Sequence, residues 1–329
     1  MTRSSASSST ALLWPWAVRV VFTPETRNGS AEDTKEQEEP QNARKMSAAP
    51  PRGRVACVQL EPVHGQPDAS RAKCDALLDS TPLDGVVLIV LPEMAFTGYL
   101  FDAAARVPRD AEQTQRWCVE RARRHDCVVV CGAPRHAGNN VYNAQLVARP
   151  DGTTTWYDKR HLYDADEAWC TEGANPFQSL GDAIADERLG LGICMDINPY
   201  RFTGPGGELA SFHRDAGTSI LAFSSAWCEN HPSDPPSVVR RERGVAPAAR
   251  QRRTIQGWLR RLEPLENCIF VCADRVGREP LTCLGLGEGD CVFCGASCVL
   301  DLATGRVLGA LSTTEEGVLV VDLPVRADF

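Results

Sequence analysis

Three segments of this chain carry residue types that together could supply a nucleophile, a base and a fixed positive charge. Cys194 ends the short apolar run that begins at Leu191, and Met195 and Asp196 follow it. A thiol on a sharp turn after a strand can act as a nucleophile. Taken alone, this cysteine predicts little, because most free cysteines are buried and behave as small hydrophobic residues.

The first upstream segment places Glu93 behind a proline at the end of the strand predicted at 86–91. A run of β-branched residues and leucines predicts a strand that is covered on both faces. Open α/β sheets keep their ligands at the carboxyl ends of such strands. Burial there would raise the pKa of the Glu93 carboxyl and make it a usable base near neutral pH. The alternative is a glutamate beside a helix N-cap or a solvated loop charge.

The second upstream segment is Trp156 to Asp164, in which Lys159 has aromatic neighbours. It follows a turn at Pro150-Asp151-Gly152 and a threonine-rich strand, which together indicate a hairpin. Lysines after strands are usually solvated. Here the aromatic side chains would desolvate the ammonium group, which strengthens its field at a developing oxyanion.

Glu93 in LPEMAFTGY, Lys159 in YDKRHLY and Cys194 in GICMD resemble, in this order, the catalytic residues of the nitrilase superfamily of carbon–nitrogen hydrolases. The resemblance runs from about Val55 to Val321 and includes the opening strand RVACVQL. It implies an α/β fold, the four-layer α-β-β-α sandwich of that superfamily. It also implies that the chain needs neither a metal nor another cofactor.

Longer sequence segments resemble one particular group within this superfamily. The segments GLGICMDINPYRF, TIQGWLRRLEPLE and FVCADRVG are most similar to the fungal protein N-terminal asparagine/glutamine amidohydrolases. This resemblance implies that proteins or peptides with N-terminal Asn or Gln are deamidated to Asp or Glu, which feeds the N-degron pathway. One departure is the Pro/Arg-rich stretch His231 to Arg253, which stands where fungal members can carry a longer insertion.

Two other functions stay open. One is a hydrolase of the same superfamily that acts on a small free amide, carbamoyl or nitrile group. The other is a non-catalytic member that binds amides, which the intact set Glu93, Lys159 and Cys194 disfavours.

The resemblance also implies a mechanism. Glu93 takes the proton of Cys194, and the thiolate attacks the side-chain amide carbon. Lys159 and the backbone N–H of Met195 stabilise the oxyanion. Ammonia leaves, and water then releases the acid from a cysteine thioester. Glu167 resembles a second glutamate that many members keep near the lysine, with Asp166 or Asp164 as alternatives.

Substrate recognition must distinguish a terminal Asn from an internal one, so an acid should meet the free α-ammonium group. Asp196 and Asp274 are the acids nearest the catalytic motifs in sequence, and Asp274, at a predicted strand end, is preferred. Its alternative is a pair with Arg275 or a backbone cap. Tyr99 and Trp227 follow strands and are predicted pocket walls, although such residues more often belong to a core.

At 329 residues the chain could hold one large domain or two, and the resemblance implies one hydrolase domain at 51–329 after an extension at 1–50. The chain is 43% hydrophobic, which suffices for a sizeable core, and its net charge of -8 argues against nucleic acid as a partner. No apolar run is long enough to predict a membrane span. The fourteen cysteines favour a reduced compartment over a disulfide scaffold. The sequence does not indicate an oligomeric state.

The cysteine cluster at 291–298 has Cys-x-x-Cys spacing at Cys291 and Cys294, which zinc sites use. The stretch VFCGASCVLDLATGRV also reads as two strands of a hairpin joined by a bend of small residues. In that interpretation the cysteines fill the core, and we favour it over a metal site.

The first fifty residues differ in composition from the rest. Residues 1–45 begin with a Ser/Thr-rich segment that carries arginines and no acid before Glu25, which is typical of a mitochondrial transit peptide. The charged segment after it predicts disorder. Met46 offers an alternative start, so a mitochondrial form and a cytoplasmic form are both expected; the alternative is a cytoplasmic enzyme with an upstream extension of no function.

Strand and helix signals alternate along the rest, as an α/β sandwich requires. Strands are predicted at 54–60, 86–91, 127–132, 141–148, 153–157, 189–194, 218–223, 268–273, 292–300 and 317–322. Helices are predicted over Ala69 to Ser80, Ala111 to His125 and Gln251 to Glu263, the last with its apolar residues on one face.

Overall fold

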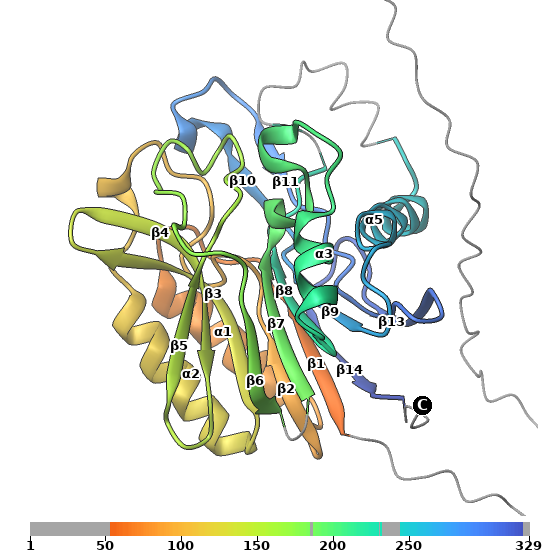
Figure 1. Cartoon of the computed structure of the whole chain (residues 1–329). Helices are drawn as coiled ribbons and strands as arrows, with labels where there is room; N and C mark the ends of the chain where they lie inside the picture. Colours follow the sequence, from red (N-terminus) through yellow and green to blue (C-terminus); the bar gives the residue numbers. More distant parts are fainter. Residues whose placement is uncertain (1–52, 185–186, 230, 232–243, 325–329) are drawn as a thin grey trace, which may run out of the picture.

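The computed structural model describes residues 53–184, 187–229, 231 and 244–324. The predicted extension at 1–50 and its targeting segment lie outside the described residues. In the described part, two six-stranded sheets are stacked face to face, and helices cover the outer face of each sheet (Figure 1). The predicted four-layer α-β-β-α sandwich is therefore confirmed.

The first sheet has the order β14-β1-β2-β3-β4-β5, in which β1, β2 and β3 are parallel and the other neighbours antiparallel. Its strands are β1 (Arg54–Gln59), β2 (Val86–Val90), β3 (Val128–Ala137), β4 (Asn140–Ala148), β5 (Thr154–Asp158) and β14 (Gly317–Asp322). Helices α1 (Pro67–Asp79) and α2 (Ala111–His125) cover its outer face. Leu78 and Trp117 of these helices pack against Ile89.

The second sheet has the order β13-β12-β9-β8-β7-β6, with β7, β8 and β9 parallel. Its strands are β6 (Ser179–Ile184), β7 (Glu187–Ile193), β8 (Ile220–Ser225), β9 (Ile269–Asp274), β12 (Cys298–Asp301) and β13 (Arg306–Ala310). Helices α3 (Glu208–Asp215) and α5 (Pro247–Arg261) cover it, and Leu209 and Trp258 pack on Phe223. The sequence did not predict α3, β6 or β13.

The layer between the sheets is apolar. Alternate residues of the parallel strands, such as Val55 and Leu88 in one sheet and Leu191 and Ala222 in the other, are buried together there. Burying each aliphatic side chain contributes about 1.5–3 kcal/mol. This packing brings the carboxyl ends of β2 and β7 to the same end of the sandwich, the upper end in Figure 1.

The single strand predicted at 292–300 is wrong. The short strand β11 (Asp290–Val292) pairs with β10 (Arg278–Pro280) in a separate two-stranded sheet, and β12 forms its hairpin with β13 instead. The chain bends because Gly295 and Ala296 both have left-handed φ values, +58° and +62°. A Cβ on Gly295 would meet Val276 at 2.6 Å.

The cysteines of the 291–298 cluster do not gather around one point. Cys298 on β12 lies opposite Cys272 on β9, whereas the Cys291 thiol lies 3.1 Å from that of Cys228. All three cysteines of the cluster are buried, as core packing requires. Among the described residues, no group of three or more His, Cys, Asp or Glu side chains is arranged to hold a metal ion. The helices described there are also too short or too polar to cross a bilayer.

Candidate active site

Cys194 stands at the carboxyl end of β7, where the strand turns into a short 3-10 helix, Cys194–Ile197. Its φ of +37° is a left-handed conformation that residues with a side chain rarely adopt. The turn is closed by Asp196, whose Oδ2 accepts the backbone N–H of Ile193 at 2.9 Å. Backbone strain of this kind clusters at functional sites. Here the strained residue is the one at which strand β7 ends and the turn begins.

Glu93 lies just beyond β2 and is held by a close approach of β3. The N–H of Gly132 donates to Pro92 O at 3.1 Å, and Ala95 N–H donates to Gly132 O at 2.9 Å. A Cβ on Gly132 would lie 2.5 Å from the Cα of Glu93, so only glycine allows this contact. The Glu93 side chain is fully buried at the end of the sandwich.

Lys159 follows β5, and its side chain reaches the same buried point. Its Nζ forms ion pairs with Glu93 Oε1 at 2.6 Å and with Asp166 Oδ2 at 2.5 Å. The ammonium also lies 5.8 Å from the ring centre of Tyr99. Cys194 is within electrostatic reach of both Glu93 and Lys159. The structure thus brings the three predicted catalytic residues together from three distant strand ends.

The sequence missed one residue of this centre, Asn143. Its Nδ2 donates to Glu93 Oε1 at 2.7 Å and to Asp166 Oδ1 at 3.1 Å, so it bridges the two carboxylates. The sequence feature that could have identified it is its position as a polar residue inside β4, a mostly buried and mostly apolar strand. A buried amide in such a strand needs polar partners.

Of the three acids predicted to lie beside the lysine, the structure places Asp166 there and not Glu167. Glu167 is exposed, whereas its neighbour Asp166 is fully buried and pairs with Lys159. The reason is the turn after Tyr163. The N–H groups of Asp166 and Glu167 both donate to Tyr163 O, and the Tyr163 N–H donates to Asp166 Oδ2 at 2.9 Å. This turn aims the side chain of Asp166 inward.

Burial and charge set the protonation states. Desolvation raises the pKa of Glu93, and Lys159 only partly offsets this shift. Burial by itself would lower the pKa of Lys159, but the charges of Asp166 and Glu93 outweigh it, and the pKa rises well above its usual value. Desolvation, followed by the Glu93 charge, also raises the pKa of the Cys194 thiol. The resting centre therefore holds an ammonium and a neutral thiol.

A neutral thiol needs a base, and Glu93 is placed to be one. Its Oε1 is occupied by Asn143 and Lys159, but its Oε2 is buried without a hydrogen-bond partner. Buried polar atoms are rarely left unpaired, and each exception needs an explanation. A carboxylate oxygen that stays free to accept a proton within electrostatic reach of the Cys194 thiol is such an explanation.

Asp196 does not face a substrate. Its two oxygens accept the Tyr157 hydroxyl and the backbone N–H groups of Arg160, His161 and Ile193. The role predicted for Asp196 in binding an α-ammonium group is therefore wrong, because its acceptor sites hold the turn together. Met195 is buried in that turn, one residue after the thiol.

Asp274 ends β9, and its backbone aligns with Ser225 at the end of β8. Its Oδ1 accepts the N–H groups of Trp227 and Arg275 at 2.9 and 3.0 Å, which matches the predicted alternative of a backbone cap. Its Oδ2 is buried without a hydrogen-bond partner. Desolvation raises the pKa of Asp274 well above its usual range, and the N–H groups of Trp227 and Arg275 and the nearby Ser225 hydroxyl offset only part of this shift.

The two predicted pocket walls differ in their surroundings. Tyr99 is buried with its ring near the Lys159 ammonium, and its hydroxyl has no hydrogen-bond partner. Trp227 is half-buried, with its ring edge-on to Trp258 at 6.0 Å and under the Arg261 guanidinium. Of these two residues, only Tyr99 has its ring facing the Lys159 ammonium.

Asp166→Asn should lower kcat by about 10²-fold, a typical loss for one positioned polar group in a catalytic centre. The carboxylate that fixes Lys159 is lost, while the size of the side chain is kept. Ammonia release and thermal unfolding would be measured together. Glu167→Gln is the matched control, since Glu167 is exposed and should retain full activity. Equal losses in both variants would contradict the assignment of Asp166.

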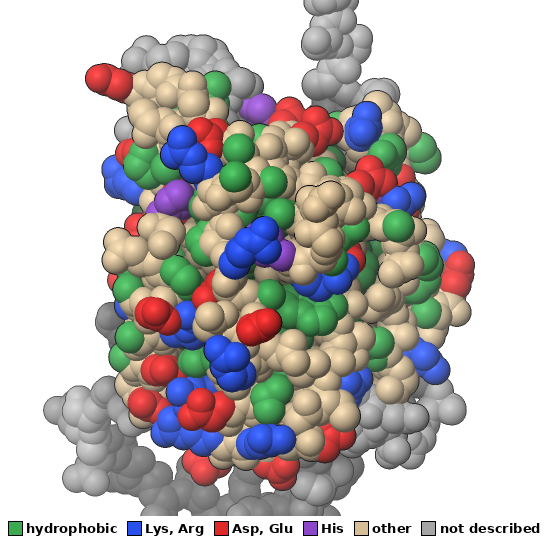
Figure 2. Space-filling view, turned by 90° about the vertical axis from the view of Figure 1, so that its left-hand side faces the viewer, with side chains coloured by type: hydrophobic (Ala, Val, Ile, Leu, Met, Phe, Trp, Pro, Cys, Tyr) green, Lys and Arg blue, Asp and Glu red, His purple; other side chains and the backbone are tan. Residues whose placement is uncertain are grey.

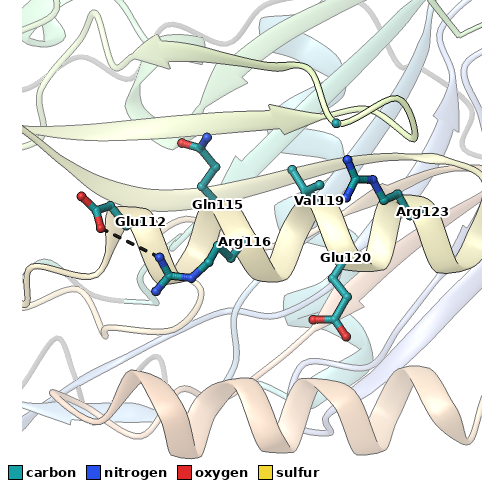
Figure 3. A pocket seen from close by; sticks show the side chains of 7 residues that line it. Glu112, Gln115, Arg116, Val119, Glu120 and Arg123 are labelled. Atoms are coloured by element: carbon teal, nitrogen blue, oxygen red, sulfur yellow. Dashed lines mark ion pairs between the residues drawn. The ribbon is translucent and has the colours of Figure 1, made fainter.

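Two surface hollows lie elsewhere. One, of about 500 Å³, is lined by α2 residues and Gly152, and within it Glu112 pairs with Arg116 (Figure 3). The other, of about 630 Å³, lies between the end of α5 and the 302–305 turn. On the face in Figure 2, Lys and Arg are interspersed with Asp and Glu, so neighbouring surface charges offset each other. Neither hollow is lined by a residue of the Glu93–Lys159–Cys194 centre.

Comparison with known proteins agrees with this geometry. A carbon-nitrogen hydrolase family model matches residues 54–327. The chain is 28% identical over 304 residues to the protein N-terminal amidase of Schizosaccharomyces pombe, covering 82% of this chain and 99% of the relative.

Solved structures share the fold. An N-terminal amidase with an Asn-Glu-Ala peptide superposes with a TM-score of 0.63 at 18% identity, and one with a Gln-Val peptide with 0.66 at 17%. Both cover 82% of this chain and 97% of the other. The chain therefore belongs to the carbon-nitrogen hydrolase family and is a hydrolase that acts on the carbon–nitrogen bonds of linear amides.

Proposed function

We propose that this enzyme deamidates the side chain of an N-terminal Asn or Gln in proteins and peptides, leaving Asp or Glu and releasing ammonia. The observation that carries the proposal is the similarity to a protein N-terminal amidase over 99% of that relative's length. The solved amidase structures that share the fold were obtained with peptides that begin with Asn or Gln. The acidic products would enter the N-degron pathway.

The mechanism uses the buried centre. Glu93 Oε2 accepts the proton of Cys194, and the sulfur attacks the amide carbon to form a tetrahedral intermediate. Lys159 Nζ and the Met195 N–H stabilise its oxyanion, each such donor contributing about 3–4 kcal/mol to barrier lowering. Glu93 then returns its proton to the leaving ammonia. A thioester remains, and Glu93 activates the water that hydrolyses it.

Recognition of the free amino terminus falls to Asp274 in this proposal. Its carboxyl is buried among neutral donors only, the N–H groups of Trp227 and Arg275 and the hydroxyl of Ser225, and an α-ammonium group would supply a charged donor that offsets the cost of burying the charge. The alternative acid, Asp196, is already saturated by four hydrogen bonds.

The test is a panel of short peptides that differ only in their first residue. Peptides that start with Asn or Gln should release ammonia and gain about one dalton as the amide becomes an acid. The same peptides with an acetylated amino terminus should be inert. If free small amides are hydrolysed and these peptides are not, the enzyme is a different hydrolase of the family.

A further inference from the structure

Gln145 is a polar residue in the apolar layer between the two sheets. It lies on β4, two residues before Val147, which packs in that layer, and its side chain is fully buried. Its Nε2 crosses to the other sheet, where it donates to Ser224 Oγ at 2.9 Å and to Ala222 O at 3.3 Å. Its Oε1 is buried without a hydrogen-bond partner. A buried amide with an unpaired oxygen costs stability, so packing alone does not explain why a glutamine stands here.

Ser224 on β8 continues this connection back to the first sheet. Its side chain is also fully buried, and its hydroxyl donates to Leu91 O at 2.8 Å. Leu91 comes directly after β2 and stands two residues before Glu93. The hydrogen bonds therefore run from β4 to β8 and from β8 to the end of β2. We call Gln145 and Ser224 together the inter-sheet bridge.

The inter-sheet bridge lies beside both halves of the Glu93–Cys194 pair. Ser224 aligns with Ile193 on the neighbouring strand β7, and Ile193 is the residue before Cys194. On the side of the base, the Glu93 N–H also crosses between the sheets and donates to Ser225 O at 3.3 Å. The base follows a strand of one sheet and the nucleophile follows a strand of the other. Their separation therefore depends on how the two sheets are placed relative to each other.

Apolar packing and hydrogen bonding fix such a placement to different degrees. Hydrophobic burial has no preferred direction, whereas a hydrogen bond weakens steeply when its geometry changes. Proton transfer needs heavy atoms about 2.6–3.2 Å apart, and a misplacement of about 1 Å can cost about 10²-fold in rate. Directional hydrogen bonds between the sheets are therefore worth their cost where the two reacting groups come from different sheets.

We propose that Gln145 and Ser224 are positioning residues, which hold the Glu93 carboxyl and the Cys194 thiol at the separation that proton transfer needs. They act through the two strand ends and not on the substrate. Their removal therefore lowers kcat and leaves KM unchanged. This inference rests on the mechanism given with the proposed function, in which Glu93 is the base for Cys194.

Gln145→Met tests the inter-sheet bridge with little change in side-chain volume. The flexible thioether fills the same space but cannot donate a hydrogen bond. The kcat for a peptide that begins with Asn should fall by about tenfold to about 10²-fold, with KM unchanged. The melting temperature should stay the same or rise, because an apolar side chain replaces an amide that is only partly hydrogen-bonded. Steady-state ammonia release and thermal denaturation would measure both.

Gln251→Met is the matched control. Gln251 lies on α5, on the outer side of the second sheet, and its Nε2 donates to Leu311 O at 2.5 Å. The same substitution there also removes a hydrogen bond but should leave kcat unchanged.

A second variant tests whether the two residues form one connection. Ser224→Ala should also lower kcat. The double variant Gln145→Met/Ser224→Ala should lose no more than about the larger of the two single losses, because residues in one hydrogen-bond network are not additive. Losses that simply multiply would overturn the inter-sheet bridge as a unit.

A further measurement needs no substrate. Cys194 must also lose its proton when its sulfur displaces iodide from iodoacetamide, because the thiolate is the nucleophile. The alkylation rate of Cys194, followed by mass spectrometry of the peptide that contains it, therefore reports on the same pair of groups. This rate should be lower in Gln145→Met than in the unmodified enzyme and in Gln251→Met.

The outcomes separate this inference from the proposed function. If peptides that begin with Asn are deamidated but Gln145→Met keeps either the kcat or the alkylation rate, the inter-sheet bridge is overturned and the proposed function stands. A joint fall of kcat and melting temperature in Gln145→Met, or an equal loss of kcat in Gln251→Met, would also overturn it. Slower alkylation of Cys194 in Gln145→Met, with no deamidation of any peptide by the unmodified enzyme, would support the inter-sheet bridge and overturn the proposed function.

Discussion

Cys194→Ala is expected to lower the rate of ammonia release by about 10⁶-fold, the loss seen when a hydrolase loses its nucleophile. Without the sulfur, Glu93 and Lys159 can still polarise an amide, but no thioester forms. The fold should persist. Deleting one buried sulfur leaves a small cavity, which typically costs about 1 kcal/mol of unfolding free energy. Ammonia release and thermal denaturation of the same preparation would check both expectations.

The many other cysteines provide the control for this experiment. Cys118 lies on α2, is as buried as Cys194, and packs only in the layer between that helix and the first sheet. Cys118→Ala should keep full activity with a similar loss of stability. If Cys194→Ala retained more than a trace of activity, Cys194 would not be the nucleophile.

The parallel core of the fold was predictable because its strands are nearly continuous apolar runs. Such runs identified β1, β2, β7, β8 and β9, and α2 was predicted with both bounds correct. The elements that the sequence missed are short or irregular. Helix α3 has eight residues, and β6 pairs with β7 through an irregular register that interrupts the period-two pattern. Alternation of residue types cannot reveal such a strand.

The meeting of Glu93 and Lys159 near Cys194 was predictable to the level of one residue per strand end. Glu93, Lys159 and Cys194 each follow a recognisable strand, and they converge because β2 and β5 of one sheet and β7 of the other all end at the same end of the sandwich. The choice between Asp166 and Glu167 was not predictable, because consecutive acids in a turn differ only in the direction that the turn gives them. Asn143 was not predicted as a residue of the site because its two partners, the carboxylates of Glu93 and Asp166, are distant from it in sequence.

Glu93→Gln is expected to lower kcat by about 10³-fold, within the range for loss of a general base. The amide keeps the size of the side chain, and its Oε1 can still accept from Asn143 and Lys159. It cannot take the proton of Cys194, whose thiol has a raised pKa and stays neutral without a base. Steady-state ammonia release would measure this loss.

Stability should move in the opposite direction, which distinguishes a lost base from a damaged fold. The unmodified centre buries two carboxylates, Glu93 and Asp166, around a single ammonium, and the raised pKa of Glu93 shows that its charge is costly there. Glu93→Gln leaves one carboxylate for one ammonium, so the melting temperature should stay the same or rise. Lys159→Met would instead leave both carboxylates unpaired, and it should lower the melting temperature while also abolishing activity. If Glu93→Gln and Lys159→Met both unfolded the protein to the same degree, Glu93 would be a structural partner of the lysine and not its catalytic complement.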